Sequence, residues 1–155
     1  MHGMSDYRRS LVGVRLPEGR FTVEESLHRM FCEAVFASGW ESEYAHPLFL
    51  YLAAHCGKGM SLSAFFKLLG TELEAGVTFG EGALEFHQAV RIGAEYRVHT
   101  TIADVVTKVG RRRGAFDVVT CDSDVLDLEG QLVGTSREAY IVPAAEGSSS
   151  ADCRK

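Results

Sequence analysis

The sequence predicts an α+β domain in which a long central helix is wrapped by an antiparallel β-sheet. Two observations lead to this prediction. Residues 23–69 carry apolar side chains at helical spacing or in dense apolar runs. From residue 77 onward the spacing becomes that of strands, interrupted by turns rich in glycine. Strands of this length need cover on one face, and an apolar helix is the natural filler.

The first predicted helix spans residues 23–37. Thr22 and Glu25 have the form of a capping box, and apolar residues recur on one face of the segment behind them. Gly39 is expected to end this helix, because glycine readily adopts the left-handed conformation of a C-cap.

The central apolar segment follows and contains one break. Pro47 suits the first turn of a helix, and the residues after it are apolar almost all round, which indicates cover on several sides. Residues 57–59 interrupt this run with two glycines. Ser61 or Ser63 is then expected to cap a buried helix that runs through residues 65–69 and is ended by Gly70.

The second half of the chain predicts a meander of four strands. The turns between the last three strands contain glycine and charged residues. A helix enclosed by such a meander is the hot-dog arrangement, although the pattern alone also allows other α+β sandwiches. The predicted strands are residues 83–90, 95–109, 115–126 and 131–142.

Length and composition narrow the class of protein. At 155 residues the chain is expected to form one domain, over residues 11–143, between a flexible N-terminus at residues 1–10 and a disordered tail at residues 144–155. A net charge of -5 does not favour binding to nucleic acid or to an anionic membrane. No apolar run approaches the ~20 residues of a membrane span, and the N-terminus does not read as a signal peptide. We therefore expect a cytoplasmic protein.

The cysteines indicate neither a disulfide framework nor a metal site. They are scattered, with no C-x-x-C pair and no ligand spacing around them. Reduced thiols, and no bound metal or other cofactor, are the expectation for Cys32, Cys56, Cys121 and Cys153.

Several short motifs resemble, in order, those of the MaoC-like (R)-specific hydratases and dehydratases, with an opening like that of the N-terminal-type dehydratase domain. Residues 84–96 are similar to the family's F-x-x-P-V-R-x-G-D strand. The turn at residues 110–114 resembles its basic turn, and residues 127–133 resemble its N-x-x-G-E-L-V hairpin. The likeness spans roughly residues 11–143.

This resemblance implies a hot-dog fold that works as a dimer on acyl thioesters of coenzyme A or acyl carrier protein. Members of the family act on the 3-hydroxyacyl/2-enoyl pair and need no further cofactor. Some form heterodimers in which one subunit alone carries the catalytic residues. The partner is therefore expected to be a second copy or a catalytic hot-dog subunit.

The family's catalytic signature, D-x-N-P-[LIV]-H, is altered in this chain. Its proline and aliphatic residue match Pro47 and Leu48, but its Asp falls on Tyr44, its Asn on His46 and its His on Phe49. Adding or removing water across an acyl double bond needs an acid and a base. A phenol with a pKa of about 10 is a weak proton donor, and phenylalanine transfers no proton. The dyad is missing.

Other residues are weaker catalytic candidates. His46 is a possible substitute base, with Glu41 or Glu43 as its orienting partner. The alternative is that His46 only replaces the family's Asn in a turn. His55 and His87 are expected to pack or meet solvent rather than catalyse.

Two segments are candidates for binding the substrate. A tip of three arginines suits phosphates or an acidic carrier protein, unless it is only a solvated turn. By resemblance, backbone N–H groups at the start of the helix near residues 59–63 polarise the thioester carbonyl, although the family's A-P-x-x-F run is changed here. The candidate residues are Arg111, Arg112, Arg113, Gly59, Ser61, Ser63 and Phe65.

The leading prediction is a hydroxyacyl-thioester dehydratase subunit that lacks its own dyad and supports a catalytic partner. Two alternatives stay open. One is a freestanding thioesterase or polyketide-tailoring enzyme with altered catalytic residues. The other is an acyl-binding module without catalysis.

Overall fold

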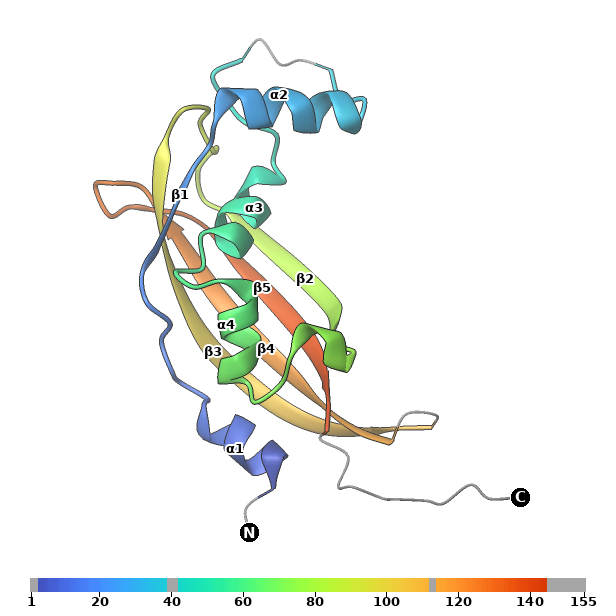
Figure 1. Ribbon diagram of the computed structural model, residues 1–155. Helices are drawn as coiled ribbons and strands as arrows, with labels where there is room; N and C mark the ends of the chain where they lie inside the picture. The colour runs from blue at the N-terminus through green and yellow to red at the C-terminus, as the bar shows by residue number, and fades with distance from the viewer. Residues whose placement is uncertain (1–2, 39–41, 112–113, 145–155) are drawn as a thin grey trace.

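A computed structural model describes residues 3–38, 42–111 and 114–144. One five-stranded antiparallel sheet, in the order β1-β3-β4-β5-β2, curves around the helical segment (Figure 1). This confirms the predicted α+β arrangement. The strands are β1 (Gly19–Thr22), β2 (Thr78–Phe86), β3 (Glu95–Gly110), β4 (Gly114–Leu126) and β5 (Leu132–Pro143).

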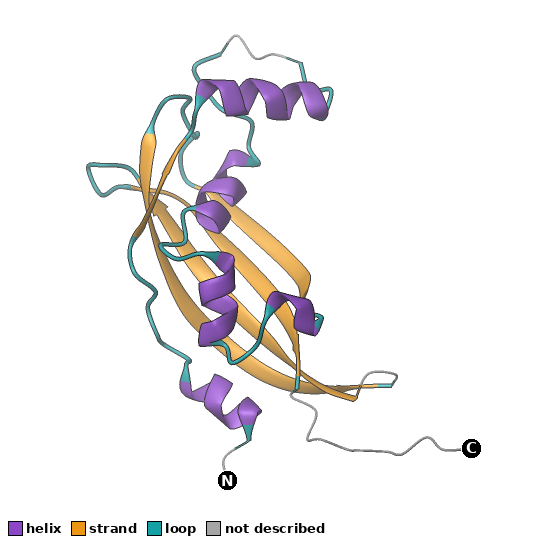
Figure 2. Cartoon of the chain, in the orientation of Figure 1, coloured by secondary structure: helices purple, strands orange, loops and turns teal. Residues whose placement is uncertain are grey.

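The central helix is two short helices rather than one long one. They are α3 (Phe49–Cys56) and α4 (Leu62–Leu68), which lie against the concave face of the sheet (Figure 2). The break lies where the chain passes very close to the start of β1 and to the residues just before it. A Cβ on Gly19 would lie 1.7 Å from the carbonyl oxygen of Gly57, and Gly59 has a φ of +74°. Glycine is needed on both sides of this contact, and glycines do not favour a continuous helix.

The helix that follows β1 differs from its prediction at both ends. It is α2 (Glu25–Ala34), shorter than residues 23–37. Thr22 is the last residue of β1, and the N-cap is Glu24 with no side-chain hydrogen bond, so the predicted capping box is wrong. Pairing of Thr22 with Glu95 on β3 takes precedence over the local capping motif.

The long strands lie close to their predicted positions, whereas β2 is shifted. It spans residues 78–86 instead of 83–90 and forms one edge of the sheet. Glycines at positions 80 and 82 remove the alternation that marks a strand with one buried face. The strand is instead defined by its pairing with β5.

The N-terminal segment contains a helix that the sequence analysis missed. It is α1 (Met4–Ser10), and its Arg8 is only 1% exposed. Nη1 of Arg8 lies 2.9 Å from Oδ2 of Asp117 on β4 and also donates to the carbonyl of Pro143, while Nε donates to the carbonyl of Leu69. The expectation for residues 144–155 falls almost entirely outside the described residues.

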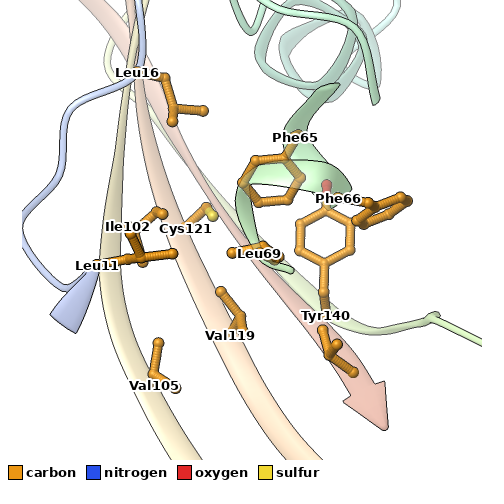
Figure 3. Close-up of a cluster of buried hydrophobic side chains, with 11 residues drawn as sticks. Leu11, Leu16, Phe65, Phe66, Leu69, Ile102, Val105, Val119, Cys121 and Tyr140 are labelled. Atoms are coloured by element: carbon orange, nitrogen blue, oxygen red, sulfur yellow. The ribbon is translucent and has the colours of Figure 1, made fainter. Parts of the chain in front are cut away.

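The space between helices and sheet holds two apolar clusters. The α4 cluster, shown in Figure 3, contains Phe65, Phe66 and Leu69 packed against the inner faces of β3, β4 and β5. The α3 cluster contains Phe49, Leu50, Ala53 and Ala54 with Val125 and other residues near the opposite end of the same strands. The predicted filling of the sheet by the segment near Phe65 is therefore confirmed. A one-turn 3₁₀ helix, η1 (Leu73–Ala75), connects α4 to β2.

Ser61, one of the two predicted caps, is the N-cap of α4. Its hydroxyl accepts the N–H of Ala64 at 3.1 Å. We expect Ser61→Ala to lower the free energy of unfolding by about 1 kcal/mol, because an N-cap hydrogen bond is lost. Ser63→Ala, at the second residue of the same helix and exposed, is the matched control and should change it by less than about 0.5 kcal/mol. Urea denaturation of both variants measures the difference, and equal effects would contradict the assignment.

Candidate functional site

The loop before α3 holds the positions of the missing dyad. Tyr44 forms an isolated bridge with Arg91 and is 43% exposed. The guanidinium of Arg91 lies 5.3 Å from the centre of the Tyr44 ring and 2.8 Å from the carboxylate of Glu43. Glu43 therefore pairs with Arg91 and not with His46. Glu41 lies outside the described residues.

Phe49, which stands at the position of the family's catalytic histidine, lies in the core. It is the first residue of α3 and is fully buried. Its ring packs edge-on against Phe31 at 5.5 Å and against His28 at 5.1 Å. The position that would carry the family's histidine therefore anchors α3 to α2.

His46 forms hydrogen bonds within the turn itself. Its Nδ1 accepts the N–H of Leu48 at 3.2 Å, the contact expected of the Asn that it replaces. Its ring lies 5.1 Å from that of Phe31, and its own N–H donates to Nε2 of His28 at 2.9 Å. These contacts agree with the alternative in which His46 shapes the turn. A surface hollow of about 230 Å³ lies beside it, lined partly by Tyr44 and Pro47.

The buried His28 makes the stability of this region dependent on pH. Burial, helped by the nearby His46, lowers the pKa of His28, and its Nε2 must stay unprotonated to accept the N–H of His46. Below about pH 6.5 the unfolded chain binds a proton that the folded protein resists, so stability should fall as the pH falls. Buried carboxylates with lowered pKa values, such as Glu138, stop stabilising the folded state only at lower pH.

We therefore expect the urea midpoint to drop between about pH 7.5 and about pH 5.5. His28→Gln should reduce that drop, because the glutamine oxygen can accept the same N–H without titrating. His87→Gln is the control, since His87 is exposed. A drop of the same size in the His28 variant would contradict this cause.

A second group of polar side chains lies at the break between α3 and α4. We call it the Glu138 cluster: His55 on α3, Lys58 in the break, and Glu138 and Tyr140 on β5. Oε2 of Glu138 lies 3.1 Å from Nδ1 of His55 and 2.8 Å from Nζ of Lys58, and it accepts a hydrogen bond from Tyr140. Glu138, Lys58 and Tyr140 are buried, whereas the side chain of His55 is 26% exposed.

The Glu138 cluster keeps a carboxylate charged inside the protein. Burial opposes ionisation, but the hydrogen bond of His55 and the charge of Lys58 outweigh it and lower the pKa of Glu138 to about 2. Burial and the charge of Glu138 raise the pKa of Tyr140, so Tyr140 is a hydrogen-bond donor to the carboxylate. A carboxylate bound to one imidazole nitrogen leaves the other nitrogen available to move a proton.

The remaining candidates do not come together at one place. His87 follows β2 and lies 3.7 Å from Glu85 on the exposed edge. Phe65 is fully buried, with its ring 5.4 Å from that of Tyr140. Ser63 and Arg111 are exposed, and Gly59 serves the close contact with the segment before β1. Arg112 and Arg113 lie outside the described residues.

Sequence reasoning missed Lys58, Glu138 and Tyr140. The sequence does contain one indication of Glu138. It alternates with Tyr140 and Val142 on the last strand and so points to the same inner face, where an acidic residue is unusual. Lys58 gave no such signal, because a lysine between two glycines reads as a solvated turn.

Comparison with known proteins identifies the family. Residues 10–136 match the family described as the FAS1-like dehydratase domain region. The chain belongs to this family. The match confirms the resemblance to MaoC-like dehydratases that the motifs indicated.

Several solved structures that are similar to this FAS1-like dehydratase-domain protein are dehydratases. The HadBC (3R-hydroxyacyl-ACP dehydratase) complex of Mycobacterium tuberculosis matches with a TM-score of 0.64 and 19% identity, over 84% of this chain and 96% of that one. The ChsH1-ChsH2 complex of the same organism matches with a TM-score of 0.65 and 14% identity, over 94% of this chain and 92% of that one. A MaoC-like dehydratase from Rhodospirillum rubrum matches with a TM-score of 0.53 and 21% identity, over 86% of this chain and 92% of that one.

These likenesses support the hot-dog fold. No curated protein sequence matches the chain. Among the described residues, no helix is long and apolar enough to cross a membrane, and no group of three or more His, Cys, Asp or Glu side chains is placed to hold a metal ion.

Proposed function

We propose that this protein is a (3R)-hydroxyacyl-thioester dehydratase subunit that lacks its own dyad and supports a catalytic partner. The observation that carries the proposal is the state of the dyad positions within a dehydratase-family domain. Tyr44 contacts Arg91 at the surface, and Phe49, the first residue of α3, is buried against Phe31 of α2. Phenylalanine transfers no proton and a phenol is only a weak proton donor, so the two side chains do not replace an Asp and His dyad.

The edge strand β2 supports a partner of the same fold. Its outer edge is unpaired within the described part of the chain, and it exposes Phe79 and Phe86, each at 45%. A long edge with exposed aromatic side chains favours pairing with a second sheet. Two of the similar structures are named as complexes of two components, HadBC and ChsH1-ChsH2. We therefore favour a heterodimer with a catalytic hot-dog subunit over a homodimer.

The substrate of this assembly is proposed to be an acyl thioester on coenzyme A or acyl carrier protein, with no further cofactor. Arg111 on the hairpin tip and the segment from Gly59 to Phe65 remain the proposed contacts for carrier phosphate and thioester. A cytoplasmic location is part of the same proposal.

Co-expression with a hot-dog protein that carries an intact D-x-N-P-x-H signature tests the proposal. We expect a complex of the two chains by native mass spectrometry and hydration of crotonyl-CoA by that complex. Replacing the partner's signature His should abolish turnover, whereas Tyr44→Phe in this chain should leave it unchanged. A loss of turnover in Tyr44→Phe would place catalysis in this chain and defeat the proposal.

A second candidate function, hydrolysis of acyl thioesters by this chain alone, is favoured by one observation. His55 is oriented by the buried Glu138 and keeps part of its ring at the surface, which suits activation of a water molecule. Release of free thiol from hexanoyl-CoA, lost in His55→Gln and retained in His87→Gln, would support this function. No thiol release from the purified chain would remove it.

A further inference from the structure

Helix α2 turns much of its apolar face away from the core. The sequence places Leu27, Met30 and Ala34 on one face, at the spacing that usually marks the buried side of a helix. In the structure these three residues are exposed, and the buried residues of α2 are His28 and Cys32. The two sides are about a quarter turn apart around the helix. One side of α2 therefore anchors it, and a second, apolar side faces solvent.

Large apolar side chains are exposed along α2 and at its end. We call them the α2 patch: Leu27 at 39%, Met30 at 65%, Val35 at 46% and Phe36 at 95% exposed. A group of this kind within a few turns of chain marks a surface that binds a partner, whereas single exposed apolar residues are ordinary.

The backbone holds Phe36 in an unusual conformation. Its φ is +52°, and within the described ranges it is the one residue other than glycine with a positive φ. A bulky side chain rarely adopts this conformation, and such strain persists mainly where a function uses it. The strained conformation leaves the ring almost completely exposed, as a docking residue requires.

The α2 patch lies at the end of the sheet that also exposes the last residue of β2. Helix α2 starts directly after β1, and in Figure 1 its C-terminal end points away from β1 and projects past α3. The loop that follows α2 pairs with the segment after β2, since Ala45 donates its N–H to the carbonyl of Val90 at 2.8 Å. Phe86, at the end of β2, is 45% exposed. The patch therefore extends the surface that the edge strand offers to a partner.

The area of the α2 patch is too small to hold a partner by itself. A stable interface buries about 800 Å² on each partner, and even an aromatic side chain buries only about 150–250 Å². Four side chains, three of them already partly covered, fall well short of that area. The nine-residue strand β2 with its two exposed rings is limited in the same way. The two surfaces are better explained as parts of one interface, covered by one partner.

The charges beside the patch disfavour a second copy of this chain as that partner. The helix and its N-cap carry three glutamates and one arginine: Glu24, Glu25, Glu33 and Arg29. The arginine already pairs with Glu25 at 3.2 Å. Two copies that met through α2 would bring the same excess of carboxylates together, whereas lysine or arginine on a different partner would complement it.

We propose that the α2 patch is a second docking surface for the catalytic hot-dog subunit, beside the edge strand β2. That subunit covers the patch with apolar side chains and places lysine or arginine near Glu33. The inference rests on the proposed function, because its occupant is the subunit that supplies the dyad. It assigns the outer side of α2 to recognition of the partner and gives it no part in the reaction.

Photo-crosslinking within the co-expressed complex tests which molecule covers the patch. In one variant p-benzoylphenylalanine replaces Met30, and in the control it replaces Val109, which is 83% exposed at the far end of β3. We expect irradiation to join position 30 to the subunit that carries the D-x-N-P-x-H signature. Position 109 should give no crosslink to that subunit.

Variants of the patch measure its contribution to affinity by calorimetric titration of the purified chain into that subunit. Met30→Gln and Phe36→Gly should each weaken binding about tenfold, because apolar contacts are lost. Phe36→Gly should leave the melting temperature of the chain unchanged or raised, since glycine accepts a positive φ. Glu33→Lys should weaken binding by a factor that shrinks as salt is added. Val109→Thr is the control and should leave the affinity unchanged.

Three results would overturn the inference. A crosslink from position 30 to a second copy of this chain, or to neither subunit, in an intact complex would refute it and leave the proposed function standing. Unchanged affinity in both Met30→Gln and Phe36→Gly would also refute it. Failure of the chain to form any complex with a signature-bearing hot-dog subunit would overturn both the inference and the supporting role on which it rests.

Discussion

Arg8→Ala is expected to lower the free energy of unfolding by about 3–5 kcal/mol, because removing one partner of a buried ion pair leaves the other charge uncompensated. Asp117 is fully buried, and Arg8 is its charged partner at 2.9 Å. Burial raises the pKa of Asp117, but hydrogen bonds from Thr107, Arg8 and Ser5 outweigh burial and keep it low. Without Arg8, that carboxylate must stay charged in the core or take up a proton.

The measurement is urea denaturation followed by circular dichroism. Arg9→Ala is the matched control, because its ion pair with Asp6 is about half exposed on the same helix, and it should cost less than about 1 kcal/mol. Asp117→Asn in the Arg8→Ala background should recover part of the loss. An effect of Arg8→Ala as small as that of Arg9→Ala would show that α1 does not stabilise the domain.

Glu138→Leu is expected to have an effect of similar size, about 3–5 kcal/mol, because it leaves Lys58 buried without its counter-charge. The double variant Lys58→Met with Glu138→Leu should recover most of that loss, since an apolar pair of similar volume often replaces a buried ion pair at little cost. Urea midpoints of the wild type, both single variants and the double variant form the cycle. Additive losses would contradict the coupling of the two residues.

The sheet was predictable because its pattern is local. Strands β3, β4 and β5 alternate inward and outward side chains over many residues, and turns with glycine separate them. The strand β2 and the helix α1 were not predictable in the same way. Glycines remove the alternation from β2, and α1 is held by Arg8 reaching Asp117, a contact between residues far apart in the sequence. The predicted capping box at Thr22 is absent because Thr22 pairs with Glu95 in the sheet instead.

The parts of the candidate site also differ in how far the sequence predicts them. The altered signature at Tyr44 and Phe49 was visible in the sequence, because a motif with a proline in place aligns without gaps. The Glu138 cluster was not, since it joins the end of α3 to β5 across 83 residues. Such a juxtaposition has no signature in the chain order.

Hydration of crotonyl-CoA by the purified chain alone, followed by the loss of the enoyl absorbance, tests the central claim most directly. With Tyr44 and Phe49 at the dyad positions, we expect a rate no higher than that of buffer, and a rise only when a hot-dog partner with Asp and His is added. Rapid hydration by the isolated chain would show that it carries its own acid and base, and the account of a supporting subunit would be wrong.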